Sequence, residues 1–435
     1  MLRCSSVKSA KVVPVLIHPS AIKHFMERVV LQKLIIILLL QEKHINMKII
    51  FLAKWPFLLG VMITVTVCSI NVTGNSNRSY VAEQSEPLAY QKPKTEVSIV
   101  GEDFYINGKP TFKGREWKGY RIEGLLPNSR MVNGIFDDLN PASVHMWKYP
   151  DTQKWDPARN TAEFLKNMPI WKAYGLLSFN INFQGGSPQG YSQSQPWFNT
   201  AFDEIGALRP AYMKRLKLIL DKADELGMVV NLGLFYFGQD EKLKDEKAVI
   251  NAVDNAIDWL FKNNYKNILI EVANECNNKA YNHAIIKADR IHELIDRVKA
   301  KKKNGFRYLV STSYNGGDLP SPIVVQKSDY ILLHGNGVSD PNKIVEMVKS
   351  VKAIEGFMLK PVMFNEDDHY DFDKDFNNFI AASSVHASWG FFDYRKKGES
   401  FEEGFQSVPV DWGINSDRKK GFFNLLKEIT SVENP

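Results

Sequence analysis

The feature that most constrains the fold is a repeated alternation between short apolar runs and longer amphipathic segments. The apolar runs, such as GLLSFNINF (175–183) and MVVNLGLFYF (228–237), are apolar on both faces, which is typical of strands buried in a parallel sheet. The segments between them carry apolar residues at helical spacing, and regular strand–helix alternation indicates a parallel sheet covered by helices. Eight such units favour an α/β fold of the closed (β/α)8 TIM-barrel type over an open sheet.

The predicted elements run from residue 121 to residue 430. Strands are expected at 121–126, 175–183, 228–237, 267–275, 306–313, 329–337, 361–366 and 387–394, and helices at 161–174, 210–226, 245–262, 285–300, 341–354, 373–385 and 418–430. The helix at 210–226 is the best delimited, because Pro210 stands at its start and Gly227 at its end, the positions these residues prefer. Ahead of the barrel, Asn107-Gly108 lies between two strand-like runs and predicts a short N-terminal β-hairpin.

The first 95 residues differ in composition from the rest and are expected to lie outside the barrel domain at 96–435. Residues 1–74 carry nine of the 55 basic side chains and two of the 49 acidic ones, so the basic balance of the chain belongs to this leader. Lys48 and Lys54 flank the start of an apolar run that is followed by small residues before Asn75, a pattern typical of a cleaved signal or an uncleaved membrane anchor. Residues 75–95 are polar and are interpreted as a linker. We therefore expect an exported protein that is secreted, periplasmic or anchored at the cell surface.

Charge and cysteine content exclude a nucleic-acid partner and an internal disulfide for the barrel domain. The barrel domain is close to neutral, so it lacks the basic surface that nucleic-acid binding requires, and no nucleic-acid partner is expected. Two of the three cysteines, Cys4 and Cys68, lie in the leader. Cys276 is then alone in the barrel domain, which can form no internal disulfide.

Polar side chains gather where the predicted strands end. Asn274 and Glu275 end the fourth strand, and Asn365 and Glu366 end the seventh. The other such residues are Asn182 and Gln184 on the second strand, Tyr236 on the third, His334 on the sixth and Trp389 on the eighth. The carboxyl ends of the strands form the face of a TIM barrel on which active sites lie. Two carboxylates facing each other there suit glycoside hydrolysis, in which one protonates the leaving oxygen and the other attacks the anomeric carbon or activates water.

The run EVANE (271–275) and the run PVMFNE ending in Glu366 resemble the fourth- and seventh-strand motifs of the retaining glycoside hydrolases of clan A, particularly the cellulase-like family 5. The resemblance covers residues 96–432. It implies hydrolysis of O-glycosidic bonds in a poly- or oligosaccharide by double displacement, with Glu275 as acid/base, Glu366 as nucleophile and no cofactor. Carboxylates about 5 Å apart are then expected.

The same resemblance implies roles for three further residues. Asn274 would bind the sugar 2-hydroxyl, Trp389 would form a platform under the sugar, and His334 would orient Glu366 or a hydroxyl. From the residues alone, His334 is equally well a buried histidine of the core.

The sequence also departs from the family pattern. Cys276 stands where relatives usually have Pro, and the second strand lacks the Arg that many relatives place near the nucleophile. Arg121, on the predicted first strand, is the candidate to replace it. Substrate contacts are also expected from two long loops, 124–160 and 184–209, which carry Arg130, Trp147, Tyr149, Trp155, Tyr191, Trp197 and Phe198.

Two other functions fit parts of this pattern. One is a carbohydrate-binding TIM barrel without activity. The other is a metal-dependent lyase or isomerase that uses Asp240, Glu275, Glu366 and His369. No metal is expected, because Asp367, Asp368 and His369 are adjacent on a short loop and rarely converge on one ion in that arrangement. Glu271 is interpreted as a buried partner of a basic or hydroxyl group.

Overall fold

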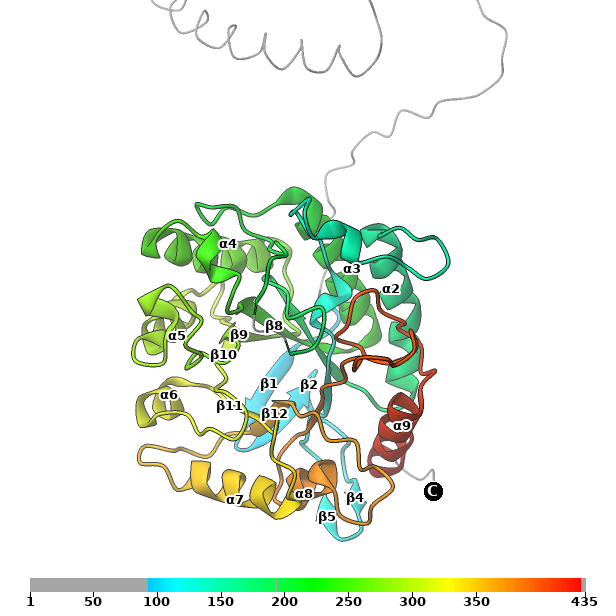
Figure 1. The fold of residues 1–435 in the computed structure, drawn as a ribbon. Helices are drawn as coiled ribbons and strands as arrows, with labels where there is room; N and C mark the ends of the chain where they lie inside the picture. Colours follow the sequence, from blue (N-terminus) through cyan, green and yellow to red (C-terminus); the bar gives the residue numbers. More distant parts are fainter. Residues whose placement is uncertain (1–92, 192–193, 432–435) are drawn as a thin grey trace, which may run out of the picture. The chain divides into compact units, whose positions relative to one another are not determined.

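The computed structural model describes residues 93–191 and 194–431. Within these ranges, eight parallel strands form a ring with helices on its outside (Figure 1). The strands are β6 (Asn128–Arg130), β7 (Ser178–Asn182), β8 (Val229–Phe235), β9 (Ile268–Ala273), β10 (Leu309–Ser311), β11 (Ile331–His334), β12 (Val362–Glu366) and β13 (Gly390–Phe391). The predicted (β/α)8 barrel is confirmed.

The strands follow one another around the ring in chain order. Strands β6 to β10 pair in parallel, β11 pairs with β12, and β13 pairs with β6. Parallel bridges from Met363 to Ser388 and from Asp367 to Phe391 join β12 to the last strand. At the remaining junction, the amide of Asp329 donates to the carbonyl of Val310, 2.9 Å away. The carboxyl ends of all eight strands therefore meet on one face.

The predicted first strand, 121–126, is wrong. Residues Tyr120–Arg121 (β5) pair with Glu116–Trp117 (β4) in a small antiparallel hairpin, and the chain turns at Gly124, where φ is 87°. The strand of the barrel is Asn128–Arg130, which is polar in sequence but buried throughout. Apolar content did not reveal it because its polar side chains contact partners distant in sequence, such as Phe364, Glu366 and Asn274.

The helices were predicted more accurately than the first strand. Helix α3 (Pro210–Leu226) agrees with its prediction, and Gly227 ends it with a left-handed φ of 70°. The others are α2 (Pro157–Ala173), α4 (Glu246–Lys262), α5 (Ile291–Ala300), α6 (Pro322–Lys327), α7 (Pro341–Lys352), α8 (Asn378–Ser384) and α9 (Asp417–Thr430). Helices α5 and α8 start later than predicted, and the short α6 was not predicted. Helix α2 starts earlier because the Asp156 carboxylate caps it by accepting from the amides of Ala158 and Arg159.

The N-terminal hairpin seals one end of the barrel. Strands β1 (Val97–Val100), β2 (Asp103–Ile106) and β3 (Lys109–Pro110) form it, with Asn107 and Gly108 at left-handed φ in the predicted turn. In Figure 1, β1 and β2 lie at the centre of the ring of helices. Val97 of β1 and Phe104 of β2 pack with residues at or near the start of the barrel strands: Leu126, Val229, Leu269, Tyr330, Leu332 and Met363. Only the opposite, carboxyl end is left for a site.

The end of the predicted linker is attached to the barrel. The amides of Lys94 and Thr95 donate to the carboxylate of Asp224 near the end of α3. The predicted signal or anchor at 1–74 and most of the linker lie outside the described residues. Among the residues that are described, no helix has the length and apolarity needed to cross a membrane.

Candidate active site

Two glutamates and a histidine meet at the carboxyl end of the barrel. Glu366 is the last residue of β12, His334 is the last residue of β11, and Glu275 follows β9 by two residues. One ligand atom from each of the three lies within 4.8 Å of the others. The His334 Nδ1 atom is 3.1 Å from Oε1 of Glu275 and 3.8 Å from Oε2 of Glu366. Of the two carboxylates, Glu275 is more open to solvent, with 13% of its side chain exposed against 6% for Glu366.

The backbone at Glu275 adopts a turn that directs this side chain into the site. Its φ is 52°, in the left-handed region that is uncommon for residues other than glycine. The turn is held by its amide, which donates to Oγ of Ser313 at 2.9 Å, and by its carbonyl, which accepts from the amide of Asn278 at 2.7 Å. Uncommon backbone conformations of this kind often occur at functional sites.

Arg130 is the cation beside the glutamate pair. Its Nε lies 2.8 Å from Oε2 of Glu366, and its Nη2 donates to Oδ1 of Asn274 at 2.8 Å. The side chain is 1% exposed. The sequence placed Arg130 in a loop and gave the role near the nucleophile to Arg121. That assignment of Arg121 is wrong, because its side chain is 44% exposed and pairs with Asp103 near the sealed end.

The charges in the site oppose the effect of burial. Burial raises the pKa of Glu366 overall, and Arg130, His334 and the amide of Asn336 limit the rise because they favour the ionised form. Burial lowers the pKa of His334, but the carboxylates of Glu366 and Glu275 outweigh it, and the pKa is raised overall. The ionisation of Glu366 therefore depends on its cationic and amide neighbours.

Glu271 supports the site from inside the barrel. Its carboxylate accepts from Oγ of Ser313 at 2.6 Å and from Nδ2 of Asn365 at 3.2 Å. The predicted hydroxyl partner is therefore present. The hydroxyl of Ser313 thus contacts Glu271 and also accepts from the amide of Glu275, which ties the two ends of the EVANE run together.

A cavity of about 530 Å³ opens beside Glu275. Tyr236 and Phe237 form part of its wall, with ring centroids 4.3 Å apart and planes 26° apart. The residues that line the cavity are Ser187, Gly190, Tyr191, Gln195, Tyr236, Phe237, Gly238, Glu241, Glu275, Asn278 and Ala280. None of these described lining residues is basic. The volume is in the range of small-ligand sites, and aromatic walls are common in them.

The predicted tryptophan contacts are not in this cavity. The ring of Trp389 is fully buried, stacks on Phe379 of α8 at 5.1 Å, and donates from Nε1 to Asp367. It cannot form a sugar platform, because its faces are covered by other rings. Trp147 and Trp197 are buried against each other, with centroids 5.8 Å apart. Both pack the long loops and do not line the cavity.

The two polar residues predicted at the end of β7 also lie in the interior. Asn182 is buried in the barrel next to Gly233. Gln184 donates to the carbonyl of Gln239 at 3.1 Å and accepts from the amide of Tyr236 at the same distance. Gln184 therefore positions the Tyr236 segment and does not line the cavity itself.

Of the four residues proposed for a metal-dependent lyase, the structure brings only Glu275 and Glu366 together, and Asp240 and His369 lie apart from them. In the part of the chain that the structure describes, the groups with suitable spacing are Glu275, His334 and Glu366, and separately Asp367, Asp368 and His369. Asp240 belongs to neither group; its carboxylate accepts from the amides of Asn282 and His283. Within the second group, Asp367 accepts from Trp389, from Asn378 and, at 2.7 Å, from the ring of His369.

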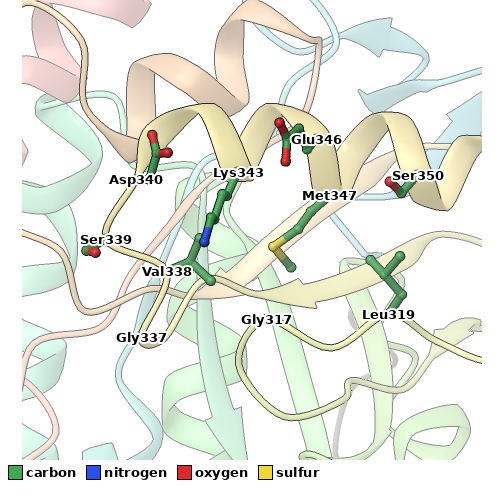
Figure 2. Close-up of a pocket in the computed structure, with 10 residues that line it drawn as sticks. All are labelled: Gly317, Leu319, Gly337, Val338, Ser339, Asp340, Lys343, Glu346, Met347 and Ser350. Atoms are coloured by element: carbon green, nitrogen blue, oxygen red, sulfur yellow. The ribbon is translucent and has the colours of Figure 1, made fainter.

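A second cavity of about 420 Å³ lies outside the ring of strands, along α7. Figure 2 shows Lys343 and Met347 of α7 projecting toward the loop that holds Val338. None of its described lining residues is aromatic, and its Asp340 carboxylate caps α7 by accepting from the amide of Asn342. Unlike the cavity beside Glu275, this cavity therefore has no aromatic wall.

No protein-family model and no curated protein matches the chain. Solved structures align with it at low identity. A candidate glycoside hydrolase from Bacteroides vulgatus is 15% identical, with a TM-score of 0.45, over 72% of this chain and 57% of that protein. A glycoside hydrolase family 5 enzyme from Prevotella bryantii is 12% identical over 70% of this chain and 95% of that chain, with a TM-score of 0.45.

An endo-1,4-beta-mannanase from Rhizomucor miehei is also 12% identical, over 77% of this chain and 98% of that chain, with a TM-score of 0.48. All three TM-scores are below 0.5, so the assignment of a function rests on the site of this protein itself.

Proposed function

We propose that the protein is a glycoside hydrolase that cleaves O-glycosidic bonds with retention of configuration. The observation that carries the proposal is the pair of carboxylates, Glu275 and Glu366, with oxygen atoms within 4.8 Å of each other at the open end of the barrel. Carboxyl groups about 5 Å apart are typical of retaining enzymes, whereas inverting enzymes leave roughly 6.5–9.5 Å for a water molecule.

In the proposed first step, the Glu366 carboxylate attacks the anomeric carbon. The glycosidic C–O bond breaks, and Glu275 gives its proton to the leaving oxygen. In the second step, Glu275 takes a proton from water, the water oxygen attacks the anomeric carbon, and the ester bond to Glu366 breaks. The difference in exposure supports these roles, since the water of the second step must reach Glu275 and give its proton to it.

The surroundings of the pair support the same assignment. Arg130 neutralises the buried Glu366 and also holds Oδ1 of Asn274. That contact leaves the Nδ2 group of Asn274 as the donor for a sugar 2-hydroxyl, the contact that strengthens in the transition state. The rings of Tyr236 and Phe237 supply an apolar wall against which a sugar can pack. The proposed substrate is accordingly a poly- or oligosaccharide.

A carbohydrate-binding barrel without activity is the second candidate. The paired carboxylates argue against it, because a binding site gains nothing from placing two acids this close and then adding a buried arginine to keep one ionised. Activity assays separate the two functions directly.

The test uses Glu275→Gln and Glu366→Gln in the full chain, assayed on a panel of polysaccharides and aryl glycosides. Each variant should lose at least about a thousandfold in kcat, because each removes a group that acts in the transition state. Product stereochemistry followed by NMR should show net retention. Full activity in both variants, or net inversion, would contradict the proposal.

We also propose that the protein is exported, on the basis of the predicted leader at 1–74. Sequencing the N-terminus of the protein isolated from its native cells should show cleavage before Asn75 or, for an anchored form, an intact leader in the membrane fraction. Recovery of the intact chain from the cytoplasm would oppose export.

A further inference from the structure

Tyr191 is connected to the proposed nucleophile, Glu366, by hydrogen bonds that join the segment after β7 to the segments after β11 and β12. It lies between β7 and α3, and its hydroxyl sits between two groups on other segments. The hydroxyl accepts from Nδ2 of Asn336 at 2.6 Å and donates to Oδ2 of Asp368 at 3.0 Å. The same Nδ2 of Asn336 donates to Oε1 of Glu366 at 2.7 Å. A continuous chain of hydrogen bonds thus starts at Glu366 and ends two residues further along at Asp368.

The donors in this chain have one consistent direction. An ionised carboxylate can only accept, so the single hydroxyl proton of Tyr191 goes to Asp368. The oxygen of Tyr191 must then accept, which requires the NH2 side of the Asn336 amide to face it. That same NH2 side faces Glu366. Rotating the amide by half a turn would place its oxygen against the carboxylate, which has no proton, and against the phenol oxygen, whose proton is already donated to Asp368.

The ring of Tyr191 is held in place from outside the site. It packs edge-on against Tyr394, with centroids 5.0 Å apart, and against Phe392 at 5.7 Å. Although 55% of the residue is exposed, its hydroxyl is turned inward to Asn336, which is 9% exposed. The ring contacts and the hydrogen bond therefore fix the position of the hydroxyl.

We propose that Asp368 and Tyr191 are positioning residues that set the amide orientation of Asn336, and that Asn336 in turn aligns Glu366 for attack. This inference rests on the proposed glycoside hydrolase function. It extends that function to positioning residues after β7 and β12, namely Tyr191 and Asp368.

Several titratable and charged groups face Glu366 and influence its pKa. The effect of Tyr191 on this pKa must be separated from theirs. They are Arg130 on β6, Tyr191 after β7, Tyr236 after β8, Glu275 after β9 and His334 on β11. Arg130 and His334 act by charge. The chain through Asn336 acts by a hydrogen bond that favours the ionised carboxylate, so its loss should raise the pKa of Glu366.

The first test compares Tyr191→Phe, Asn336→Ala and the double variant by the pH dependence of kcat/KM. Asn336→Ala should move the acidic limb up by about one pH unit, because it removes a hydrogen bond to a charged group, which is worth roughly that much. Tyr191→Phe should move the limb in the same direction by a smaller amount, because it leaves that bond in place and removes only the group that orients the amide. The double variant should move it no further than Asn336→Ala alone, because both changes interrupt one chain. Tyr394→Phe is the matched control, since it removes a hydroxyl from the neighbouring ring and should leave the limb in place.

A second measurement works without a substrate. The pKa of Glu366 can be followed by ¹³C NMR in the full chain labelled at the glutamate carboxyl carbon, with Glu366→Gln identifying the signal. It should be higher in Tyr191→Phe than in the wild-type protein and unchanged in Tyr394→Phe. An unchanged Glu366 pKa in Tyr191→Phe, or an additive shift in the double variant, overturns the proposed positioning role of Tyr191. Full activity of Glu366→Gln instead overturns the hydrolase function, whatever Tyr191 does.

Discussion

The pairing of Arg130 with Glu366 makes the strongest quantitative prediction. Arg130→Met keeps the length of the side chain and removes its charge. With the charge centres about 4 Å apart and an effective dielectric constant of about 20, the lost attraction is about 4 kcal/mol. At 1.36 kcal/mol per factor of ten, this is up to about a thousandfold in the ionised fraction of Glu366, whose pKa should rise further in addition to the raising effect of burial.

The consequence appears first in the acidic limb of the pH profile. Glu366 must be ionised to attack, so Arg130→Met should lose roughly 100- to 1000-fold in kcat/KM at pH 5–6 and recover part of it at higher pH. The assay is kcat/KM from pH 4 to 9 on the best glycan from the screen. Arg130→Lys should lose less, because it keeps the charge while giving up the second contact, to Asn274.

Stability must be followed in parallel, because Arg130 is buried. Removing one partner of a buried ion pair costs roughly 3–5 kcal/mol of unfolding free energy. Thermal unfolding by circular dichroism shows which temperature keeps both variants folded during the assay. If Arg130→Met were folded and kept the wild-type acidic limb, the electrostatic role assigned to Arg130 would be refuted.

Three further predictions follow from the site and its surroundings. The wild-type acidic limb should lie above pH 4.5, the ordinary pKa of a glutamate, because burial raises the pKa of Glu366; a kcat/KM profile tests this, and a limb below 4.5 would oppose it. Phe237→Ala should raise KM about tenfold with little change in kcat, because in the proposed function the ring packs on the sugar equally in the ground and transition states. An unchanged KM on a long glycan would show that Phe237 does not bind substrate. Trp389→Phe should leave kcat/KM within about twofold but lower the unfolding free energy by about 1–3 kcal/mol, because Asp367 loses one hydrogen-bond donor. A large loss of activity at unchanged stability would indicate that Trp389 contacts the sugar after all.

Much of this architecture could be predicted from local pattern. The helices α3 and α4 and the hairpin at Asn107-Gly108 depend on periodicity and on capping or turn residues that lie next to one another in the chain. The positions of Glu275 and Glu366 could also be predicted, because parallel barrel strands necessarily bring their carboxyl ends to one face. The identity of the two acids therefore needed no knowledge of side-chain packing.

Other features were decided only by tertiary contacts. The strand Asn128–Arg130 has no apolar signature, and its polar side chains pair with residues such as Glu366 and Asn274 that are more than a hundred positions away in the chain. Trp389 has the right place in the sequence for a sugar platform, but successive strand residues face opposite sides of a sheet, and its ring packs on α8.

The same distinction separates the two proposed catalytic carboxylates from the residues that surround and orient them. The sequence by itself determined the strand–helix alternation and the two carboxylates, since both depend on spacing along the chain. Only the tertiary structure decided that Arg130 faces Glu366 in place of Arg121, and that Tyr191 reaches Asn336. Charge pairs and hydrogen bonds act over a few ångströms in space, and no local pattern records which distant residues come that close.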